Sequence, residues 1–518
     1  MGHSCAVPAE TASGISCSPN PTDIVKNTRN SDVAMYFAAK LGPALLGFLS
    51  IFLIAKSLSP ERYGKYSLAL TLILLTAQLF GSWLNQAQFF FLPKRRDQPG
   101  GIKAWFEQIN FCVALIGAAV VMILLHVLDI GDSTALVGGM VFFAQIYWNH
   151  LSTFYQSSEE PKVQLIATTY QVAMQIAIIL TLYLFHCITV VTALMAVFLG
   201  FSAGIFLYIK RKSSNTTVNW YVPMKRDKFF RYLKLAFGYG GPFSLWFLFC
   251  QIYTFSDRFL LSWAGFNADV GRYSAARDLL LGVASMFAMP LLMVAHPMIM
   301  RIWTDRKDTN EIAEIINRNL TIIFIVGVLF CTLLFAYGPN IFAVFFSAKY
   351  QLRDYQYAMI GCAIFFSVGS MYAHKALEVT GATGRMAMLG GAVAVFSLLS
   401  NLLVINRFGL SSVIVVALLS QIAYFSGAVY MSRKLWRIFV PLERVFTMIL
   451  AAGFMYFVSR LTDMYFPAPM YILAPLSWGF LVAIILSVLV LFAFPEVNGI
   501  FLTSRPKNTN KVPLTERP

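Results

Sequence analysis

Ionisable side chains lie inside stretches of the chain that are otherwise apolar, and their chemistry needs an explanation. Lys40 lies about seven residues into an apolar stretch that begins near residue 33. A lysine at such a depth in a membrane costs about 2.5–3.5 kcal/mol on insertion scales, so compensation is expected. Two interpretations stay open: the long stem lifts the ammonium group to the headgroups, or the ammonium group faces a cleft and meets an anion there.

A second group of charges contains Asp257, Arg258, Arg277 and Asp278, with Arg272 at its edge. Neighbouring residues on a helix point about 100° apart, so an adjacent acid and arginine cannot pair properly. Partners must come from the facing helix. Asp257 with Arg277, or Arg258 with Asp278, would form a structural clamp. Alternatively, a planar guanidinium group here binds phosphate oxygens in a bidentate manner.

A third group contains His374, Lys375 and Glu378. Residues three and four apart share a helix face, so we expect all three side chains to lie together. One interpretation is an ion pair at the membrane interface. The other is a proton or cation site that drives uphill transport, because intramembrane acids often serve as relays.

The composition places these charges in a membrane. Of the 518 residues, 58% are hydrophobic and 12% are charged, against about 45–50% and 25% in a soluble domain. This excludes an ordinary soluble enzyme. The net charge of +16 lies in short loops rather than on one face, so no nucleic-acid partner is expected. The seven cysteines form no CxxC motif, and neither a metal site nor a cofactor is implied.

Apolar runs predict an all-α polytopic membrane protein with about fourteen transmembrane helices. The predicted spans are 33–55, 66–92, 106–128, 135–157, 163–185, 189–209, 235–261, 272–295, 319–346, 357–379, 386–406, 411–432, 445–463 and 472–494. With both termini in the cytoplasm, 28 of the 40 Lys and Arg residues lie in inside segments and 7 in outside segments. The excess of Lys and Arg in the inside segments predicts this orientation.

A repeated motif divides the chain into two halves. Residues 64–69 (GKYSLA) and 271–276 (GRYSAA) both read Gly-[Lys/Arg]-Tyr-Ser-x-Ala, six spans apart, and a Gly-Pro pair lies in the span before each copy. An even number of intervening spans predicts a parallel repeat with its pseudo-two-fold axis along the membrane normal. We therefore expect two pseudo-symmetric six-helix lobes plus a C-terminal helix pair. The predicted segments are a polar cytoplasmic tail (1–31), an N-terminal lobe (32–212), a basic linker (213–234), a C-terminal lobe (235–434), the extra helix pair (435–494) and a cytoplasmic tail (495–518).

These motifs resemble a known family. Residues 58–64 (LSPERYG), 257–261 (DRFLL), 271–277 and 384–409 with Asn401 are similar to Wzx-type polysaccharide-repeat flippases. These flippases belong to the multidrug/oligosaccharidyl-lipid/polysaccharide exporter superfamily. The resemblance covers roughly 33–434, and its motifs specify the superfamily better than the substrate.

The resemblance implies an undecaprenyl-diphosphate-linked oligosaccharide as the substrate, moved from the cytoplasmic to the periplasmic leaflet of the bacterial inner membrane. It also implies alternating access of the two lobes, and a polysaccharide polymerase or export machinery as a partner. On this interpretation Lys40 meets the diphosphate near the cytoplasm, and Arg258 or Arg277 receives it on the outward side. Membrane lipid is the remaining partner.

Two alternatives stay open. A multidrug or cation antiporter of the same superfamily would favour acids in the cavity of the first lobe, where the sequence has Lys40. A membrane polysaccharide polymerase or ligase should have a large outside loop, whereas the predicted outside loops are short. No Walker motif and no acidic pair in a large loop is present, so an enzyme is not expected.

Overall fold

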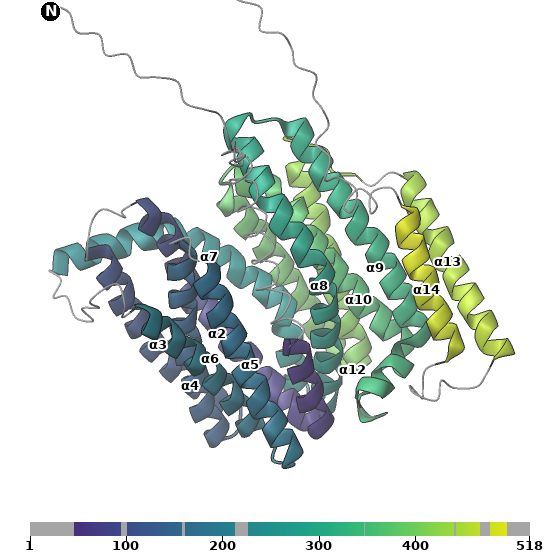
Figure 1. Ribbon diagram of the computed structural model, residues 1–518, viewed down its shortest axis with the longest axis horizontal. Coiled ribbons are helices and arrows are strands. Elements are labelled where there is room, and N and C mark those ends of the chain that lie inside the picture. The colour runs from purple at the N-terminus through teal and green to yellow at the C-terminus, as the bar shows by residue number, and fades with distance from the viewer. Residues whose placement is uncertain are drawn as a thin grey trace, which may run out of the picture.

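The computed structural model of the chain describes residues 46–94, 101–157, 161–212, 226–346, 348–439, 442–466 and 477–494. Within these ranges the fold is all-helical (Figure 1). The first described helix is short and apolar, Leu46–Ser57. It is followed by α2 (Pro60–Lys94), α3 (Gly101–Val127), α4 (Asp132–Ser157), α5 (Pro161–Leu184), α6 (Val190–Lys212), α7 (Arg226–Trp263), α8 (Asn267–Asp305), α9 (Thr309–Phe345), the 3₁₀ turn η1 (Ala348–Tyr350), α10 (Asp354–Ala373), α11 (Lys375–Val379), α12 (Thr383–Ser432), α13 (Leu442–Tyr465) and α14 (Trp478–Ala493).

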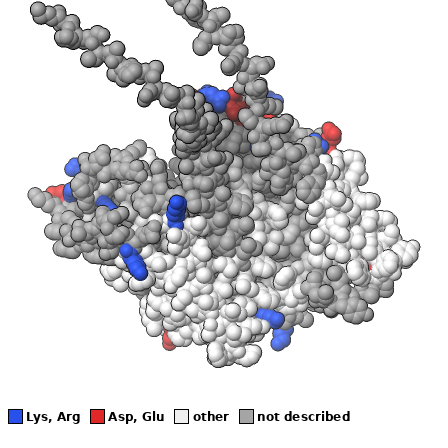
Figure 2. Space-filling view, viewed as in Figure 1, with Lys and Arg blue, Asp and Glu red and all other residues white. Residues whose placement is uncertain are grey.

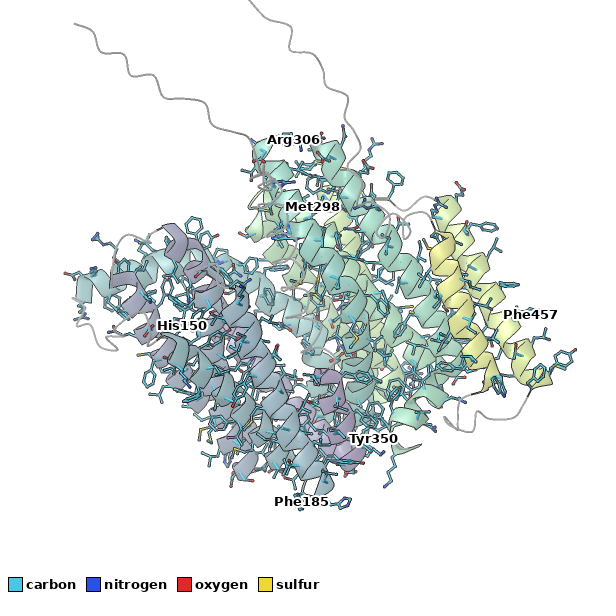
Figure 3. The ribbon with its side chains drawn as sticks, in the orientation of Figure 1. His150, Phe185, Met298, Arg306, Tyr350 and Phe457 are labelled. Carbon is cyan, nitrogen blue, oxygen red and sulfur yellow. The ribbon has the colours of Figure 1, made fainter. Side chains whose placement is uncertain are left out.

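The described helices have the length and apolar surface of a membrane protein. Nine of them are long and apolar enough to cross a bilayer, and the shortest of the nine has 21 residues, or about 30 Å of helix. Large apolar side chains cover their outer faces; Phe457 on α13, for example, points outward and is 64% exposed (Figure 3). Charged side chains are sparse on the visible face of the described residues, which is mostly white (Figure 2). The predicted all-α polytopic fold is confirmed.

The helices follow the predicted spans closely, and the longest of them contains a backbone irregularity. Two predicted spans, 386–406 and 411–432, fall within α12, whose backbone leaves helical geometry at Gly409 (φ 58°, ψ −142°). The Ser412 hydroxyl donates to the Gly409 carbonyl at 2.7 Å and approaches the Val404 carbonyl at 3.5 Å. Such a contact eight residues back requires the chain to reverse, because a straight helix would separate these residues by about 12 Å.

The helices form two groups that meet along α2, α7 and α8. In Figure 1, α2 to α6 lie on one side and α8 to α12 on the other, with the purple helix Leu46–Ser57 at the lower junction. The long helix α7 contacts both α2 and α12, and α2 also packs against α8. Helices α13 and α14 contact each other and α9 at the edge of the molecule. The α2, α7 and α8 junction therefore brings together residues from both halves of the sequence.

A tight turn connects α7 to α8 and sets the spacing of their charges. Gly265 occupies the turn with φ 85°, a conformation that side chains larger than hydrogen rarely adopt. The two helices form a hairpin and contact each other in the part next to this turn. Acids and arginines near the turn on α7 thereby face those on α8.

Candidate functional site

An ion pair between α7 and α8 lies at the centre of the candidate site. The Arg277 guanidinium donates to the Asp257 carboxylate, with 2.7 Å between Nη1 and Oδ2. The two side chains are only 9% and 3% exposed. Each charge therefore depends on the other for compensation, because a buried charge left alone is strongly destabilising.

A second ion pair joins Arg258 of α7 to Asp278 of α8. The Arg258 Nη1 also donates to the Ser67 hydroxyl at 2.6 Å and to the Thr71 hydroxyl at 3.1 Å, both on α2. Ser67 and Thr71 are four residues apart and share a helix face, so one guanidinium group can contact both. Arg258 thus connects three helices from the two groups.

The pairs run across the hairpin, as the helical spacing required. Between sequence neighbours, the structure shows instead a local contact in which the Arg258 backbone N–H donates to the Asp257 carboxylate at 2.8 Å. At the edge of the cluster, Arg272 pairs with Asp269 of the same helix at 2.9 Å and donates to the Lys349 carbonyl at 3.0 Å.

Tyr273 adds a hydroxyl group that the sequence analysis did not assign to the cluster. It donates to the Asp257 carboxylate, and Arg277 Nη1 approaches the same hydroxyl at 3.1 Å. Tyr273 precedes Arg277 by one helical turn, so its place on the same face could have been inferred from the spacing. Ser67 and Thr71 carry no such signal, because their contact with Arg258 spans 191 and 187 residues of sequence.

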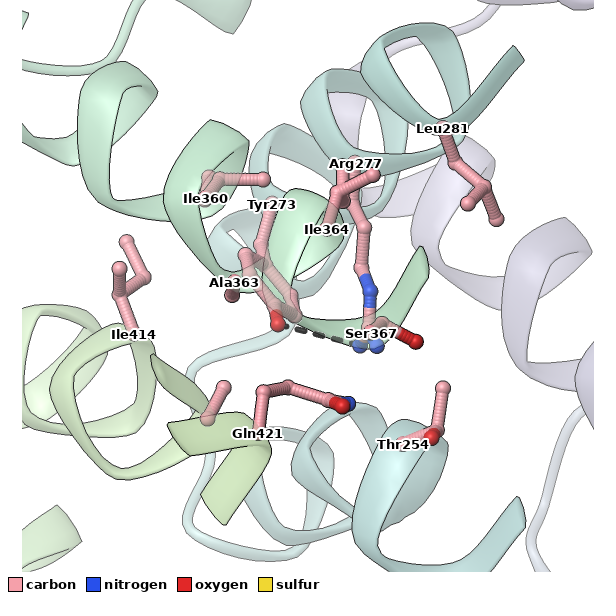
Figure 4. Close-up of a pocket in the computed structure, with 11 residues that line it drawn as sticks. Thr254, Tyr273, Arg277, Leu281, Ile360, Ala363, Ile364, Ser367, Ile414 and Gln421 are labelled. Atoms are coloured by element: carbon pink, nitrogen blue, oxygen red, sulfur yellow. Dashed lines mark hydrogen bonds between the residues drawn. The ribbon is translucent and has the colours of Figure 1, made fainter. Parts of the chain in front are cut away.

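A small pocket adjoins Arg277 within the second group of helices (Figure 4). Arg277, Gln421 and Thr254 point toward one another there, and Ser367 adds a further hydroxyl to the lining. The Gln421 Oε1 atom is buried and has no hydrogen-bond partner among the described residues. The cavity volume is about 30 Å³, room for one or two water molecules. The pocket therefore suits water beside Arg277, whereas an oligosaccharide does not fit.

His374, Lys375 and Glu378 lie where α10 passes into α11, and the Glu378 backbone N–H donates to the His374 carbonyl at 3.1 Å. Helix α10 ends at Ala373 and α11 begins at Lys375, so His374 lies at the interruption. Its ring packs against Trp246, with 5.3 Å between ring centroids, and its buried Nδ1 has no hydrogen-bond partner among the described residues. His374 therefore lies against aromatic rings rather than in the ion pair.

A histidine from α8, His296, also contacts Lys375 and Glu378. Lys375 Nζ donates to the Glu378 carboxylate and contacts His296 Nδ1 at 2.8 Å. His296 Nδ1 also lies 3.7 Å from Glu378 Oε1. The sequence analysis missed His296 because it precedes Lys375 by 79 residues and meets it only through tertiary packing.

The first group of helices contains a buried polar network that the sequence analysis also missed. His150 of α4, labelled in Figure 3, is 2% exposed. Its Nδ1 lies 2.9 Å from Gln88 Oε1 of α2 and 3.2 Å from Asn110 Nδ2 of α3. These contacts join three helices within one group, and they lie apart from the arginine cluster in both sequence and partners.

Lys40 lies outside the residues that the structure describes, so its surroundings stay a prediction. In the part of the chain that is described, no group of three or more His, Cys, Asp or Glu residues has the geometry to hold a metal ion.

Comparison with known proteins shows the family. Residues 30–303 match the family described as "Polysaccharide biosynthesis protein". This match spans more than half of the 518 residues, and the chain belongs to that family. A comparison with curated protein sequences gives no significant match.

Solved structures show the same fold at low sequence identity. A lipid II flippase, MurJ, in an inward closed conformation superposes with a TM-score of 0.66 at 16% identity, covering 89% of this chain and 97% of that one. An inward-facing multidrug resistance MATE family transporter of the MOP superfamily gives a TM-score of 0.61 at 12% identity, covering 77% and 98%. The MATE multidrug transporter DinF-BH gives 0.59 at 13% identity, covering 80% and 96%. The chain therefore shares its fold with these transporters.

Proposed function

We propose that the protein is a flippase for a polyprenyl-diphosphate-linked oligosaccharide. It moves this lipid from the cytoplasmic to the periplasmic leaflet of the bacterial inner membrane and so supplies cell-surface polysaccharide biosynthesis. Membership of the polysaccharide biosynthesis family and the fold shared with a lipid II flippase support this proposal. The lobes 32–212 and 235–434 rock against each other to expose the path to one leaflet at a time.

The observation that carries the proposal is the pair of buried arginines at the junction of the helix groups. Arg258 and Arg277 lie on one helical hairpin, and Arg258 also reaches α2. A diphosphate headgroup cannot enter hydrocarbon without compensation of its charge. Guanidinium groups supply fixed positive charge and planar donors that match phosphate oxygens.

The other charged residues take supporting roles in this proposal. Lys40 meets the diphosphate on the cytoplasmic side before the lobes rearrange. Asp257 and Asp278 hold the arginines while the site is empty, because each acid is paired with one of them. Lys375 and Glu378, together with His296, are the candidates for coupling to a proton or cation gradient, since a histidine and an acid meet there. His374 is a weaker candidate for this role, because its ring faces Trp246.

Depletion of the protein in its native cell tests the function. We expect lipid-linked oligosaccharide to accumulate on the cytoplasmic leaflet, as detected by the protection of its sugars from a membrane-impermeant oxidant in spheroplasts. Accumulation on the periplasmic leaflet alone would favour a polymerase or ligase instead. Unchanged oligosaccharide together with increased sensitivity to cationic dyes would favour the antiporter.

A further inference from the structure

The two copies of the repeated motif contact each other where α2 and α8 begin. A Cβ atom on Gly271 would overlap the Pro60 carbonyl oxygen, and one on Gly64 would lie 3.0 Å from the Asn267 carbonyl oxygen. The backbones of the two helices are therefore in direct contact at these glycines. Both are the first residue of their copy of the motif, so equivalent positions of the duplicated halves close this end of the molecule.

Aromatic and backbone contacts extend the closure around the glycines. The Tyr350 hydroxyl of η1 donates to the Leu58 carbonyl at 2.9 Å, and the Tyr350 ring meets Tyr63 edge-on at 6.0 Å. Figure 3 shows Tyr350 at the lower end, beside the helix Leu46–Ser57. These contacts also join the first group of helices to the second. These contacts involve uncharged groups, so the two groups of helices can separate here without leaving a buried charge unpaired.

Arg258 supplies the charged contact across this interface, and its partners differ in kind on the two sides. Towards α8 it pairs with the Asp278 carboxylate. Towards α2 it donates to the hydroxyl groups of Ser67 and Thr71, at 2.6 and 3.1 Å. Of the side-chain contacts of Arg258, separation of α2 from α8 would break only those with the two hydroxyl groups, because Arg258 and Asp278 belong to the same hairpin.

A hydroxyl group is a replaceable acceptor for a guanidinium group. Hydrogen bonds between two charged groups are roughly twice as strong as those between neutral groups, and phosphate oxygens match guanidinium donors well. A phosphate can therefore displace Ser67 and Thr71 from Arg258 without removing Asp278. Ser67 is itself part of the repeated motif, one helical turn beyond Gly64 on α2.

We propose that Arg258 is the latch of a gate formed by the two motif copies, and that a diphosphate opens the gate by replacing Ser67 and Thr71 as the acceptor. The proposal rests on the proposed function, because that function supplies the diphosphate. It assigns Ser67 and Thr71 a positioning role: they hold the lobes together until the headgroup arrives. On the predicted topology this gate faces the periplasm.

The distance between the lobes at this end tests the latch without any transport assay. Nitroxide labels are placed at two exposed positions, through Glu61→Cys on α2 and Gln351→Cys after η1, in a full-length chain whose native cysteines are serine. Pulsed electron paramagnetic resonance in lipid nanodiscs gives the distribution of distances. In the Ser67→Ala/Thr71→Val variant we expect the ratio of open to closed populations to rise at least about tenfold, because two hydrogen bonds to a charged group are lost.

Matched variants separate the latch from general loosening. Thr71→Ser keeps both hydroxyl groups and should leave the distribution near that of the parent. Arg272→Gln removes an arginine from the same end, but Arg272 contacts Asp269 and the Lys349 backbone of its own lobe, so the gate should stay closed. If the double variant does not purify as a monodisperse protein, Thr71→Val alone replaces it. A closed distribution in the folded variant would overturn the latch.

Farnesyl diphosphate tests the role of the ligand. It should increase the open population of the parent, whereas farnesol should not, and the Arg258→Gln variant should be open and insensitive to both. Opening of the hydroxyl variants with no response of the parent to farnesyl diphosphate would overturn release by a diphosphate. The leaflet assay tests the flippase function separately. A normal distribution of lipid-linked oligosaccharide between the leaflets after depletion would reject the flippase function, whereas it would not change the distances measured between the labels.

Discussion

Replacing Arg277 and Asp257 together should destabilise the protein less than replacing either one alone, because each compensates the charge of the other. In Arg277→Ala, the Asp257 carboxylate keeps the Tyr273 hydroxyl and the Arg258 backbone N–H as donors, and neither donor is charged. Loss of one partner of a buried pair costs about 3–5 kcal/mol. We therefore expect Arg277→Ala to lower the midpoint of thermal unfolding in detergent. The neutral pair Asp257→Asn/Arg277→Gln should recover most of the lost stability.

Transport by the same two variants distinguishes a clamp from a binding site. If Arg277 binds the headgroup, the neutral pair folds normally but leaves polymer output low, at equal protein level. Normal output from the neutral pair would assign Arg277 a structural role alone. The comparison needs both variants, because Arg277→Ala by itself reduces folding and binding together.

Lys40→Ala should depress transport while the protein still inserts. A cation that meets the headgroup contributes to the transport step, so we expect at least a tenfold lower initial rate, or about 1.4 kcal/mol. Lys56→Ala is the matched control, because Lys56 is an exposed cation of the first described helix, Leu46–Ser57. The measurement is polymer output at matched protein level, and equal output from both variants would remove Lys40 from the site.

The sequence identifies charged residues in apolar surroundings, but it does not identify all their partners. Asp257 and Arg277 could be matched because they lie at comparable distances from one turn, and helix geometry excludes pairing between neighbours. Ser67 and His296 could not be found, because polar residues of their types are common and their contacts depend on how α2 and α8 pack. That His374 acts together with Lys375 and Glu378 stays a prediction, because its ring also contacts Trp246.

Gly409 makes the reversal within α12 possible. Its φ of 58° with ψ of −142° lies in a region that is essentially restricted to glycine. We expect Gly409→Ala to destabilise the protein by about 1–3 kcal/mol, measured as a lower unfolding midpoint in detergent. Gly453→Ala on α13 is the control, because nothing lies within 4 Å of its added Cβ and helix propensity favours alanine. Equal midpoints would show that the turn tolerates a side chain.

Hydropathy predicts the helices well and their ends less well. The predicted spans 66–92 and 319–346 fall largely inside the longer helices α2 and α9, because helices continue beyond the hydrocarbon once their polar residues reach water. Composition alone cannot reveal such extensions. The contact between the His374 and Trp246 rings is equally invisible in the composition, since it depends on tertiary packing.

At the scale of the whole molecule, the distribution of basic residues predicts that both termini face the cytoplasm. Alkaline phosphatase fused after Pro518 should be inactive, whereas the same reporter inserted at Gln351 should be active, because that loop is predicted to be periplasmic. Green fluorescent protein fused after Pro518 should be fluorescent, at the position where alkaline phosphatase is inactive. Active phosphatase at Pro518 would reverse the orientation and, with it, the side on which the proposed gate opens.

The charge pairs also constrain how the chain is made. Asp257 and Arg258 of α7 are synthesised before Arg277 and Asp278, the partners that neutralise them on α8. An unpaired charge inside a bilayer is costly, by up to about 2.5–3.5 kcal/mol at the centre on insertion scales. We therefore expect α7 to wait in the translocon until α8 emerges from the ribosome, so that the two helices partition into lipid as one neutral unit.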